Sequence, residues 1–161
     1  MTNSTEGTNV SQYLTFQVAE VEYALGILGV REIIEYDTLT RVPNAPTAVR
    51  GVINLRGSVV PVVDLAVKFG REECAVTKRT CIVIVECVLD EQPAVMGVLV
   101  DAVCQVMDLA PDDIEPPPAF GAGVRIEFLL GMGKTGRGFV LLLDMDRLLS
   151  AQEAASAESA A

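Results

Sequence analysis

Histidine is absent from this sequence, and aromatic residues make up only 5% of its 161 residues. Histidine is the commonest general base in enzymes and a usual zinc ligand, so its absence excludes a mixed Cys/His zinc site and removes the usual catalytic base. Acidic neighbours such as Asp112 and Asp113 lack the ligand series of a calcium-binding loop. We therefore predict a protein with no catalytic residues, no metal and no cofactor.

Basic residues are also scarce. The chain has 12 Lys and Arg against 22 Asp and Glu, which gives a formal net charge of −10 and a pI of about 4.4. Binding to nucleic acid or to an anionic membrane surface requires clustered Lys and Arg, because phosphate charges must be neutralised. The charge balance therefore disfavours both kinds of partner.

Long apolar segments are lacking as well. No apolar run reaches the roughly 18 to 20 residues that a membrane helix needs, and the first ten residues, MTNSTEGTNV, lack the basic and apolar regions of a signal peptide. We expect a soluble cytoplasmic protein with no direct membrane insertion. Residues 1–12 are expected to form a disordered tail, because they are rich in Ser, Thr, Asn and Gly.

The chain contains four cysteines, Cys74, Cys81, Cys87 and Cys104, and no two of them form a CxxC pair. Cys81 and Cys87 are six residues apart, so in a strand they lie on the same face as the apolar residues around them. We predict reduced thiols in the core, as is usual for cytosolic cysteines. Half of all residues are hydrophobic, which is enough for a sizeable core in one domain or in two small subdomains.

The most informative segment is residues 49–69, in which two β-rich runs flank a turn at residues 54–57 that carries Arg56 at its tip. The same pattern recurs 80 residues later, which predicts internal pseudo-symmetry. The matching pairs are Gly51 with Gly131, Val60 with Val140, Val63 with Leu143, and Asp64 with Asp144. We expect a partner to bind where the two units meet.

Alternating apolar and polar residues predict strands in both halves of the chain. We expect a hairpin over residues 13–18 and 23–27, a single turn or a bent strand over 30–34, and further strands on either side of the 54–57 turn and over 80–85, 96–103 and 139–144. About five strands in each half predict two small antiparallel barrels, roughly residues 13–79 and 80–150, with an exchange of strands between them left open. Asp144 is expected to cap a short helix that ends near residue 150, before a flexible or helical Ala-rich tail at 151–161.

Residues 131–135, GMGKT, end in the GKT of a nucleotide-binding loop. The full motif requires a glycine at the position of Phe128 and a helix after the threonine, whereas residues 139–143 have the composition of a strand. A small nucleotide-binding switch that uses Gly131 to Thr135 is therefore kept as an alternative function. A structural homodimer whose interface covers the Arg56 turn is a further alternative.

Arg56 stands at the tip of its turn and cannot retreat into the core, so a carboxylate is needed to hold the guanidinium in one geometry. Glu32 is the best candidate, since it lies among apolar positions near the surface of the same unit. Exposed ion pairs add only about 0 to 1 kcal/mol to stability, so such a pair would act by orienting Arg56.

Several segments together resemble the CheW family of chemotaxis coupling proteins. They are residues 13–16 (YLTF), 30–33 (VREI), 40–46 (TRVPNAP), 51–65 (GVINLRGSVVPVVDL), 68–70 (KFG) and 97–101 (GVLVD), and the likeness runs from about Tyr13 to Leu149. The resemblance implies an all-β fold of two packed five-stranded SH3-like β-barrels with pseudo-symmetry. It also implies a non-enzymatic scaffold or adaptor that couples methyl-accepting chemoreceptors to the histidine kinase CheA in bacterial chemotaxis signalling arrays.

In that family the groove between the barrels receives the helical tip of the receptor's cytoplasmic region. The positions that match this region here are Val30, Glu32, Gly51, Asn54, Arg56 and Gly57. The regulatory domain of CheA pairs with an apolar barrel surface, for which Val98 and Val100 are the candidate residues. The resemblance implies recruitment to membrane receptor arrays through these protein contacts.

Two positions depart from the family pattern. Ala48 stands where the family commonly has an aromatic residue, so we expect a shallower groove wall, and Ala66 stands where an arginine is usual, so we expect one surface charge fewer. Both departures bear on which receptor is bound, since neither touches the Arg56 turn. We expect a standalone adaptor, because 161 residues do not hold the additional domains of the kinase.

Overall fold

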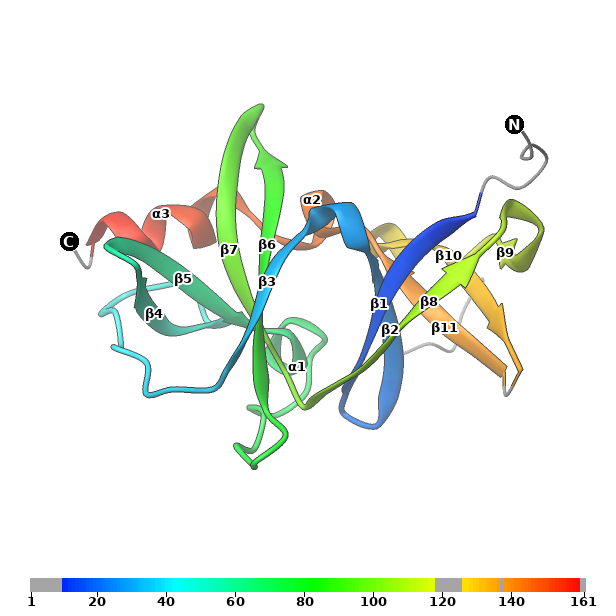
Figure 1. Cartoon of the computed structure of the whole chain (residues 1–161). Helices are drawn as coiled ribbons and strands as arrows, with labels where there is room; N and C mark the ends of the chain where they lie inside the picture. The colour runs from blue at the N-terminus through cyan, green and yellow to red at the C-terminus, as the bar shows by residue number, and fades with distance from the viewer. Residues whose placement is uncertain (1–9, 118–125, 137, 160–161) are drawn as a thin grey trace.

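The computed structural model describes residues 10–117, 126–136 and 138–159, and it consists mainly of two β-sheets that pack side by side (Figure 1). The six-stranded sheet has the order β8 (Ala102–Leu109), β1 (Ser11–Val18), β2 (Val21–Gly26), β11 (Gly138–Leu143), β10 (Leu129–Thr135) and β9 (Ile114–Glu115). The five-stranded sheet has the order β3 (Val30–Glu35), β6 (Cys81–Leu89), β7 (Gln92–Val100), β5 (Ser58–Asp64) and β4 (Val49–Leu55). Each sheet curls into a barrel-like unit, which confirms the predicted all-β fold of two packed barrels. One barrel has a sixth strand because the two-residue β9 pairs with β10.

Short helices connect and cover the strands. They are the 3-10 turns η1 (Ile27–Gly29), η2 (Pro111–Asp113) and η3 (Ile126–Phe128) and the helices α1 (Leu65–Lys68), α2 (Met145–Leu148) and α3 (Ala151–Ser159). The predicted C-terminal helix is therefore present, and α3 lies on the five-stranded barrel beside β5 and β4. Within the described ranges, no helix is long and apolar enough to cross a membrane.

The predicted pseudo-symmetry is visible in the strand orders. The series β3, β6, β7, β5, β4 matches β8, β1, β2, β11, β10 strand for strand. Gly51 and Gly131 occupy equivalent bulges, where a Cβ atom would lie 2.6 Å from the carbonyl oxygens of Thr40 and Glu115, respectively. Only glycine lets the two backbones approach this closely.

The two sheets do not follow the expected division into residues 13–79 and 80–150. Each sheet takes strands from both halves: β3 leaves the first hairpin and pairs with β6, while β8 pairs with β1. The residues near position 80 therefore separate the β4–β5 hairpin from the β6–β7 hairpin within one barrel. The edge strand β3 follows the β1–β2 hairpin of the other barrel in the sequence, and the edge strand β8 likewise follows the β6–β7 hairpin.

The expectation of purely antiparallel barrels is wrong at one pair in each sheet. β5 runs parallel to β7, and β11 runs parallel to β2. A parallel pair needs a long connection, and between β5 and β7 this connection consists of α1, the segment 69–80 and β6. Pro61 lies on β5 just before this parallel pairing begins at Val62. The missing N–H of the proline therefore interrupts no bond to β7.

The largest apolar cluster spans both barrels. Leu14, Phe16 and Val18 alternate along β1 and pack with the buried residues of the five-stranded barrel. The other face of the six-stranded sheet forms a smaller cluster that includes Ala24 and Leu142. The barrels are thus joined by a common core.

The predicted ends and thiols can also be placed. Strand β1 begins at Ser11, so the expected tail of residues 1–12 overlaps a strand, and residues 1–9 lie outside the described ranges. The turn or bent strand expected at residues 30–34 is the strand β3, preceded by η1. The four cysteines are free thiols: Cys74 and Cys87 are buried, Cys81 is half-buried and Cys104 is exposed. The prediction of core thiols for Cys81 and Cys87 is therefore confirmed for Cys87, whereas Cys81 lies only partly in the core.

Candidate functional site

The Arg56 turn is a two-residue hairpin turn between β4 and β5. Arg56 and Gly57 have φ values of 50° and 92°, the positive pair of a type I′ turn. We expected the asparagine and the glycine of this turn to tolerate positive φ, but Asn54 ends up in the strand. Its side chain closes the turn instead, because the Gly57 N–H donates to Asn54 Oδ1 at 2.9 Å. Asn54 and Gly57 therefore shape the turn that presents Arg56.

Arg56 forms an ion pair with Glu32, as predicted. Arg56 Nη2 donates to Glu32 Oε2, and the arginine side chain remains 68% exposed while that of Glu32 is 25% exposed. Glu32 lies on β3, which stands at the opposite edge of the sheet from β4. The pair is possible only because the sheet curls, and it fixes one guanidinium at the surface of the barrel.

Gly51 is a structural residue of this site. It is buried, and its lack of a side chain allows residue Thr40 to cross β4. Thr40 N donates to Val52 O at 3.0 Å, and Val52 N donates to Thr40 O at 2.8 Å. Gly51 therefore allows the backbone bonds between Thr40 and Val52 on the strand that leads to the Arg56 turn, and it offers no side chain to a partner.

Val30 begins β3 directly after the β2–β3 crossover, the segment 26–30 that passes from one barrel to the other through η1. Leu28 in this crossover is 97% exposed and Ile33 on β3 is 42% exposed, whereas Val30 is half-buried. A groove of about 420 Å³ lies beside the crossover; it is lined by Val10, Ser11, Gln12, Tyr13, Gly26, Ile27, Leu28 and Gly29. Sequence reasoning missed Leu28, although an apolar residue between Gly26 and Gly29 is the signal of an exposed apolar turn.

Val98 and Val100 are not accessible to any partner in this structure, so their prediction as contact residues is corrected. Both side chains are fully buried, with 0% exposure. Strand β7 lies between β6 and β5 inside its sheet, and both of its faces are covered at these positions. Ala48 and Ala66 are buried as well, with 7% and 4% exposure.

The segment from Gly131 to Thr135 lies within strand β10 and pairs with β11. A phosphate-binding loop has to open a helix whose N-terminal N–H groups receive the phosphates, and this segment does not. Lys134 Nζ lies 3.5 Å from Glu115 Oε2 on the neighbouring strand β9. The geometry therefore gives the nucleotide alternative no support.

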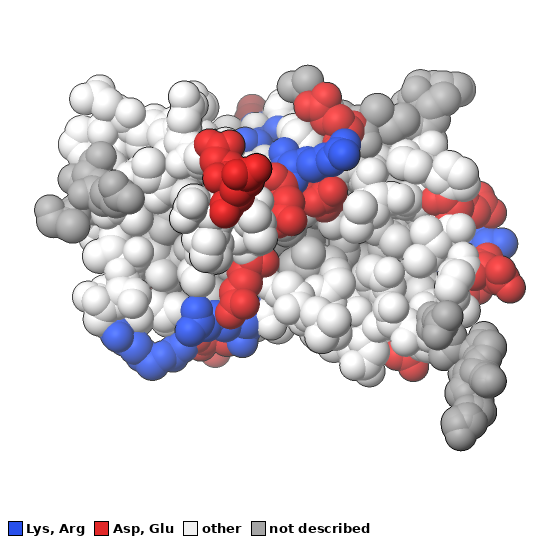
Figure 2. All heavy atoms as spheres, turned by 90° about the horizontal axis from the view of Figure 1, so that it is seen from above, with Lys and Arg blue, Asp and Glu red and all other residues white. Residues whose placement is uncertain are grey.

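The face that carries the β2–β3 crossover has mixed charges. Figure 2 looks down on this face and shows acidic and basic side chains next to one another over its middle, with broad uncharged areas around them. Beside the crossover, Arg31 Nε lies 3.7 Å from Glu86 Oε2. Such a face is suited to orienting a partner through local contacts rather than to attracting it through one strong charge.

Comparisons with known proteins agree with this geometry. The model of the CheW-like domain matches residues 12–153. The chain is 37% identical to the chemotaxis protein CheW of Klebsiella aerogenes over 156 residues, 96% of this chain and 92% of that protein, and 31% identical to that of Rhizobium meliloti over 91% and 97%. The crystal structure of the scaffolding protein TtCheW from Thermoanaerobacter tengcongensis superposes with a TM-score of 0.77 at 33% identity, covering 86% of this chain and 91% of that one. On these grounds the chain belongs to the CheW-like domain family.

Proposed function

We propose that this protein is a non-enzymatic adaptor that couples chemoreceptors to the histidine kinase CheA. The observation that carries the proposal is the pairing of an oriented, exposed cation, Arg56, with the exposed apolar crossover at Leu28 on the same barrel edge. Family membership and the likeness to chemotaxis and scaffolding proteins support it.

The spacing of these two features suits a helical partner. Leu28 and Glu32 are four residues apart, and even a fully extended strand rises only about 3.3 Å per residue, so they are separated by no more than about 13 Å. An α-helix with its side chains is about 10 to 12 Å wide. One receptor helix can therefore place apolar side chains against Leu28 and a carboxylate or carbonyl group against Arg56.

The kinase would bind elsewhere on the barrels. With Val98 and Val100 in the core, the candidates are side chains that are apolar and exposed, among them Val59 on β5 and Phe139 at the equivalent position of β11, which are 36% and 52% exposed. Exposed apolar residues mark interaction sites when they are grouped. We propose that the regulatory domain of CheA docks on such a barrel surface and that these contacts recruit the protein to membrane receptor arrays.

Co-sedimentation with receptor-bearing membranes, with and without CheA, tests the proposal. We expect the protein to pellet with these membranes and not with receptor-free ones, and we expect Leu28→Ser and Arg56→Glu to reduce the pelleted fraction. Lys134→Ala should leave the pelleted fraction unchanged.

Equal pelleting with receptor-free membranes would refute the adaptor function. Saturable ATP binding that Lys134→Ala abolishes would establish the nucleotide switch instead. A dimer that Arg56→Glu converts to a monomer would establish the structural homodimer.

A further inference from the structure

Two connections carry the chain from a strand of one barrel to a strand of the other within the described residues. The first is the β2–β3 crossover, and the second joins β7 to β8 through the single residue Asp101. Figure 1 shows the β2–β3 crossover at the upper side of the junction between the barrels and the β7–β8 connection at its lower side. The two connections therefore lie on opposite sides of the junction between the barrels.

The side chain of Asp101 holds both barrels. Its Oδ2 accepts from the N–H of Ala19, in the turn between β1 and β2, at 2.8 Å. Its Oδ1 accepts from the Sγ of Cys74, in the segment that follows α1, at 2.9 Å. The Asp101 N–H also donates to Gln17 O on β1 at 2.9 Å. One residue thus provides the covalent link and three hydrogen bonds.

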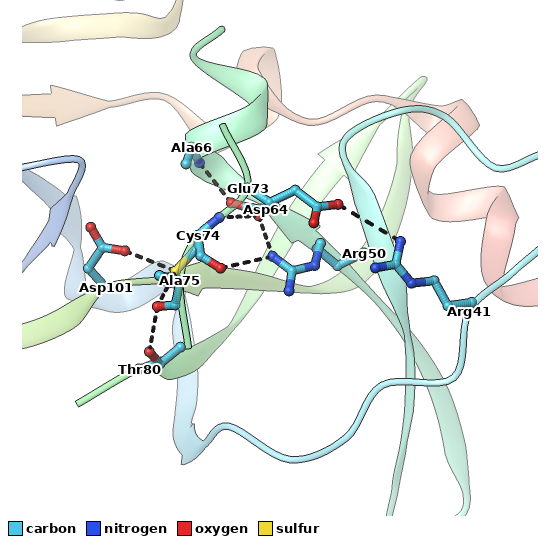
Figure 3. A network of polar contacts seen from close by, with 9 residues as sticks. All are labelled: Arg41, Arg50, Asp64, Ala66, Glu73, Cys74, Ala75, Thr80 and Asp101. Atoms are coloured by element: carbon cyan, nitrogen blue, oxygen red, sulfur yellow. Dashed lines mark hydrogen bonds and ion pairs between the residues drawn. The ribbon is translucent and has the colours of Figure 1, made fainter. Parts of the chain in front are cut away.

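Cys74 is itself firmly fixed to the five-stranded barrel (Figure 3). Its N–H donates to Asp64 Oδ2 at 2.9 Å, and its carbonyl oxygen accepts from Arg50 Nη1 at 3.2 Å. Arg50 and the fully buried Asp64 form an ion pair of 2.7 Å, so the chain of contacts from Asp101 ends in the barrel core. Burial and the hydrogen bond to Asp101 raise the pKa of the Cys74 thiol to about 12, and the thiol therefore keeps the proton that it donates.

The junction has room to move on this lower side. A cleft of about 520 Å³ lies beside Asp101, lined by Ala19 and Glu20 of one barrel and by Cys74 and its neighbours of the other. At the upper crossover, η1 has no side-chain cap and is closed by the backbone bond from Val30 N to Ile27 O. A second side chain, Asp146 of α2 directly after β11, accepts from the Val88 N–H on β6 at 2.9 Å. On the lower side of the junction, the side-chain contacts between the barrels come from Asp101.

We propose that Asp101 is a positioning residue that sets the angle between the two barrels and, through it, the width of the groove at the β2–β3 crossover. The common core around Phe16 keeps the barrels together, and the Asp101 carboxylate selects one orientation among those that the core permits. The geometric part holds whatever molecule binds in the groove. Its consequence for receptor binding rests on the function proposed above.

Residual dipolar couplings of the backbone amides measure the orientation of each sheet separately in a weakly aligned sample. In the wild-type protein, one alignment tensor should fit both sheets. In Asp101→Ala, the couplings within each sheet should still fit one tensor, but the tensors of the two sheets should differ in magnitude or direction.

Exchange of the Ala19 amide hydrogen should become about tenfold faster or more in Asp101→Ala, as expected for the loss of a bond to a charged acceptor. Asp108→Ala, which removes an exposed carboxylate from β8, the strand that follows Asp101, is the matched control and should behave as the wild type.

A single tensor for both sheets in folded Asp101→Ala would overturn the proposal. If Asp101→Ala does not fold, Cys74→Ala and Cys74→Ser decide the question. Cys74→Ala removes only the thiol donor and should separate the two tensors, whereas Cys74→Ser keeps a hydroxyl donor and should restore the common tensor. A common tensor in Cys74→Ala would equally overturn the proposal.

Binding to receptor-bearing membranes is measured on the same variants. We expect weaker binding in every variant whose tensors separate. Separated tensors with unchanged binding would refute the link between barrel angle and groove, while leaving the adaptor function intact. Absence of wild-type binding would refute the proposed function and leave the orientation result standing.

Discussion

Arg56 and Glu32 join the two opposite edges of the five-stranded sheet. Glu32 lies on β3 at one end of the strand order, and Arg56 stands at the tip of the hairpin that contains β4, the strand at the other end. The pair thus marks the place where the sheet curls toward itself. Because the arginine is well exposed, the pair contributes only about 0 to 1 kcal/mol to folding, and its main effect is to hold the guanidinium in place.

Arg56→Glu should therefore weaken receptor binding without weakening the fold. The substitution places two carboxylates together at the turn and removes the donor that we assign to the receptor. We expect a clear loss in receptor pull-down and a melting temperature within a few degrees of the wild type, since about 1 kcal/mol shifts the melting temperature of a protein of this size by about 2 to 4 °C. Arg79→Glu, the same change at an exposed arginine before β6, is the control and should bind normally. Loss of folding in Arg56→Glu would make Arg56 a structural residue.

The equivalent glycines should respond alike to alanine. At both Gly51 and Gly131 a Cβ atom would lie 2.6 Å from a backbone carbonyl oxygen, which cannot move as a flexible side chain can. We expect Gly51→Ala and Gly131→Ala each to lower the free energy of unfolding by about 1 to 3 kcal/mol, measured by urea denaturation. Gly26→Ala is the control, because no atom lies within 4 Å of its Cβ position. A neutral result at Gly51 together with a loss at Gly131 would show that the pseudo-symmetry does not extend to energetics.

Local features of this fold could be predicted from the sequence. The hairpin around Arg56 follows from its turn residues and the apolar alternation beside them, and the repeat follows from matching residues 80 positions apart. The pairing with Glu32 follows from the need of an exposed arginine for a nearby carboxylate. The assembly of strands could not, because the two halves have similar strands and nothing local determines whether β3 pairs with its own hairpin or with β6. That choice depends on the long-range core that the two barrels have in common.

Part of the candidate site was also beyond sequence reasoning. Val98 and Val100 lie in a run that could be a half-exposed or a fully buried strand, and only the position of β7 between β6 and β5 decides between them. Asp101 ends the family-like segment 97–101, but its contacts could not be predicted from the sequence, because they join it to Ala19 and Cys74, which are 82 and 27 residues away along the chain. Contacts between distant segments of this kind are visible only in three dimensions.

The buried pair of Arg50 and Asp64 should dominate stability among the ion pairs. Their side chains are 11% and 0% exposed, and Asp64 also accepts from the N–H groups of Ala66 and Cys74. Removing one partner leaves an uncompensated buried charge, so Arg50→Met should lower the free energy of unfolding by about 3 to 5 kcal/mol in urea denaturation.

The exposed pair of Arg31 and Glu86 provides the comparison for this measurement. Its side chains are 52% and 59% exposed. Glu86→Gln should therefore cost less than about 1 kcal/mol. Similar losses in Arg50→Met and Glu86→Gln would contradict the prediction that the buried pair of Arg50 and Asp64 contributes most to stability.

The stability of the protein in alkaline solution should report on Cys74. Burial and the bond to Asp101 raise the pKa of this thiol from 9.0 to about 12. As the pH rises above about 9, the unfolded chain loses the thiol proton while the folded chain keeps it, so the free energy of unfolding falls until the pH passes about 12. Burial raises the pKa of Tyr23 from 10.0 to about 12, so this residue lowers the free energy of unfolding only at higher pH.

Urea denaturation from about pH 8 to about pH 10 should therefore show a shallower decline in the free energy of unfolding in Cys74→Ser than in the wild type, because serine has no proton to release in this range. Cys104→Ser, at an exposed thiol, should change the slope less. Identical slopes in the wild type and Cys74→Ser would mean that the pKa of the Cys74 thiol is not raised in the folded protein.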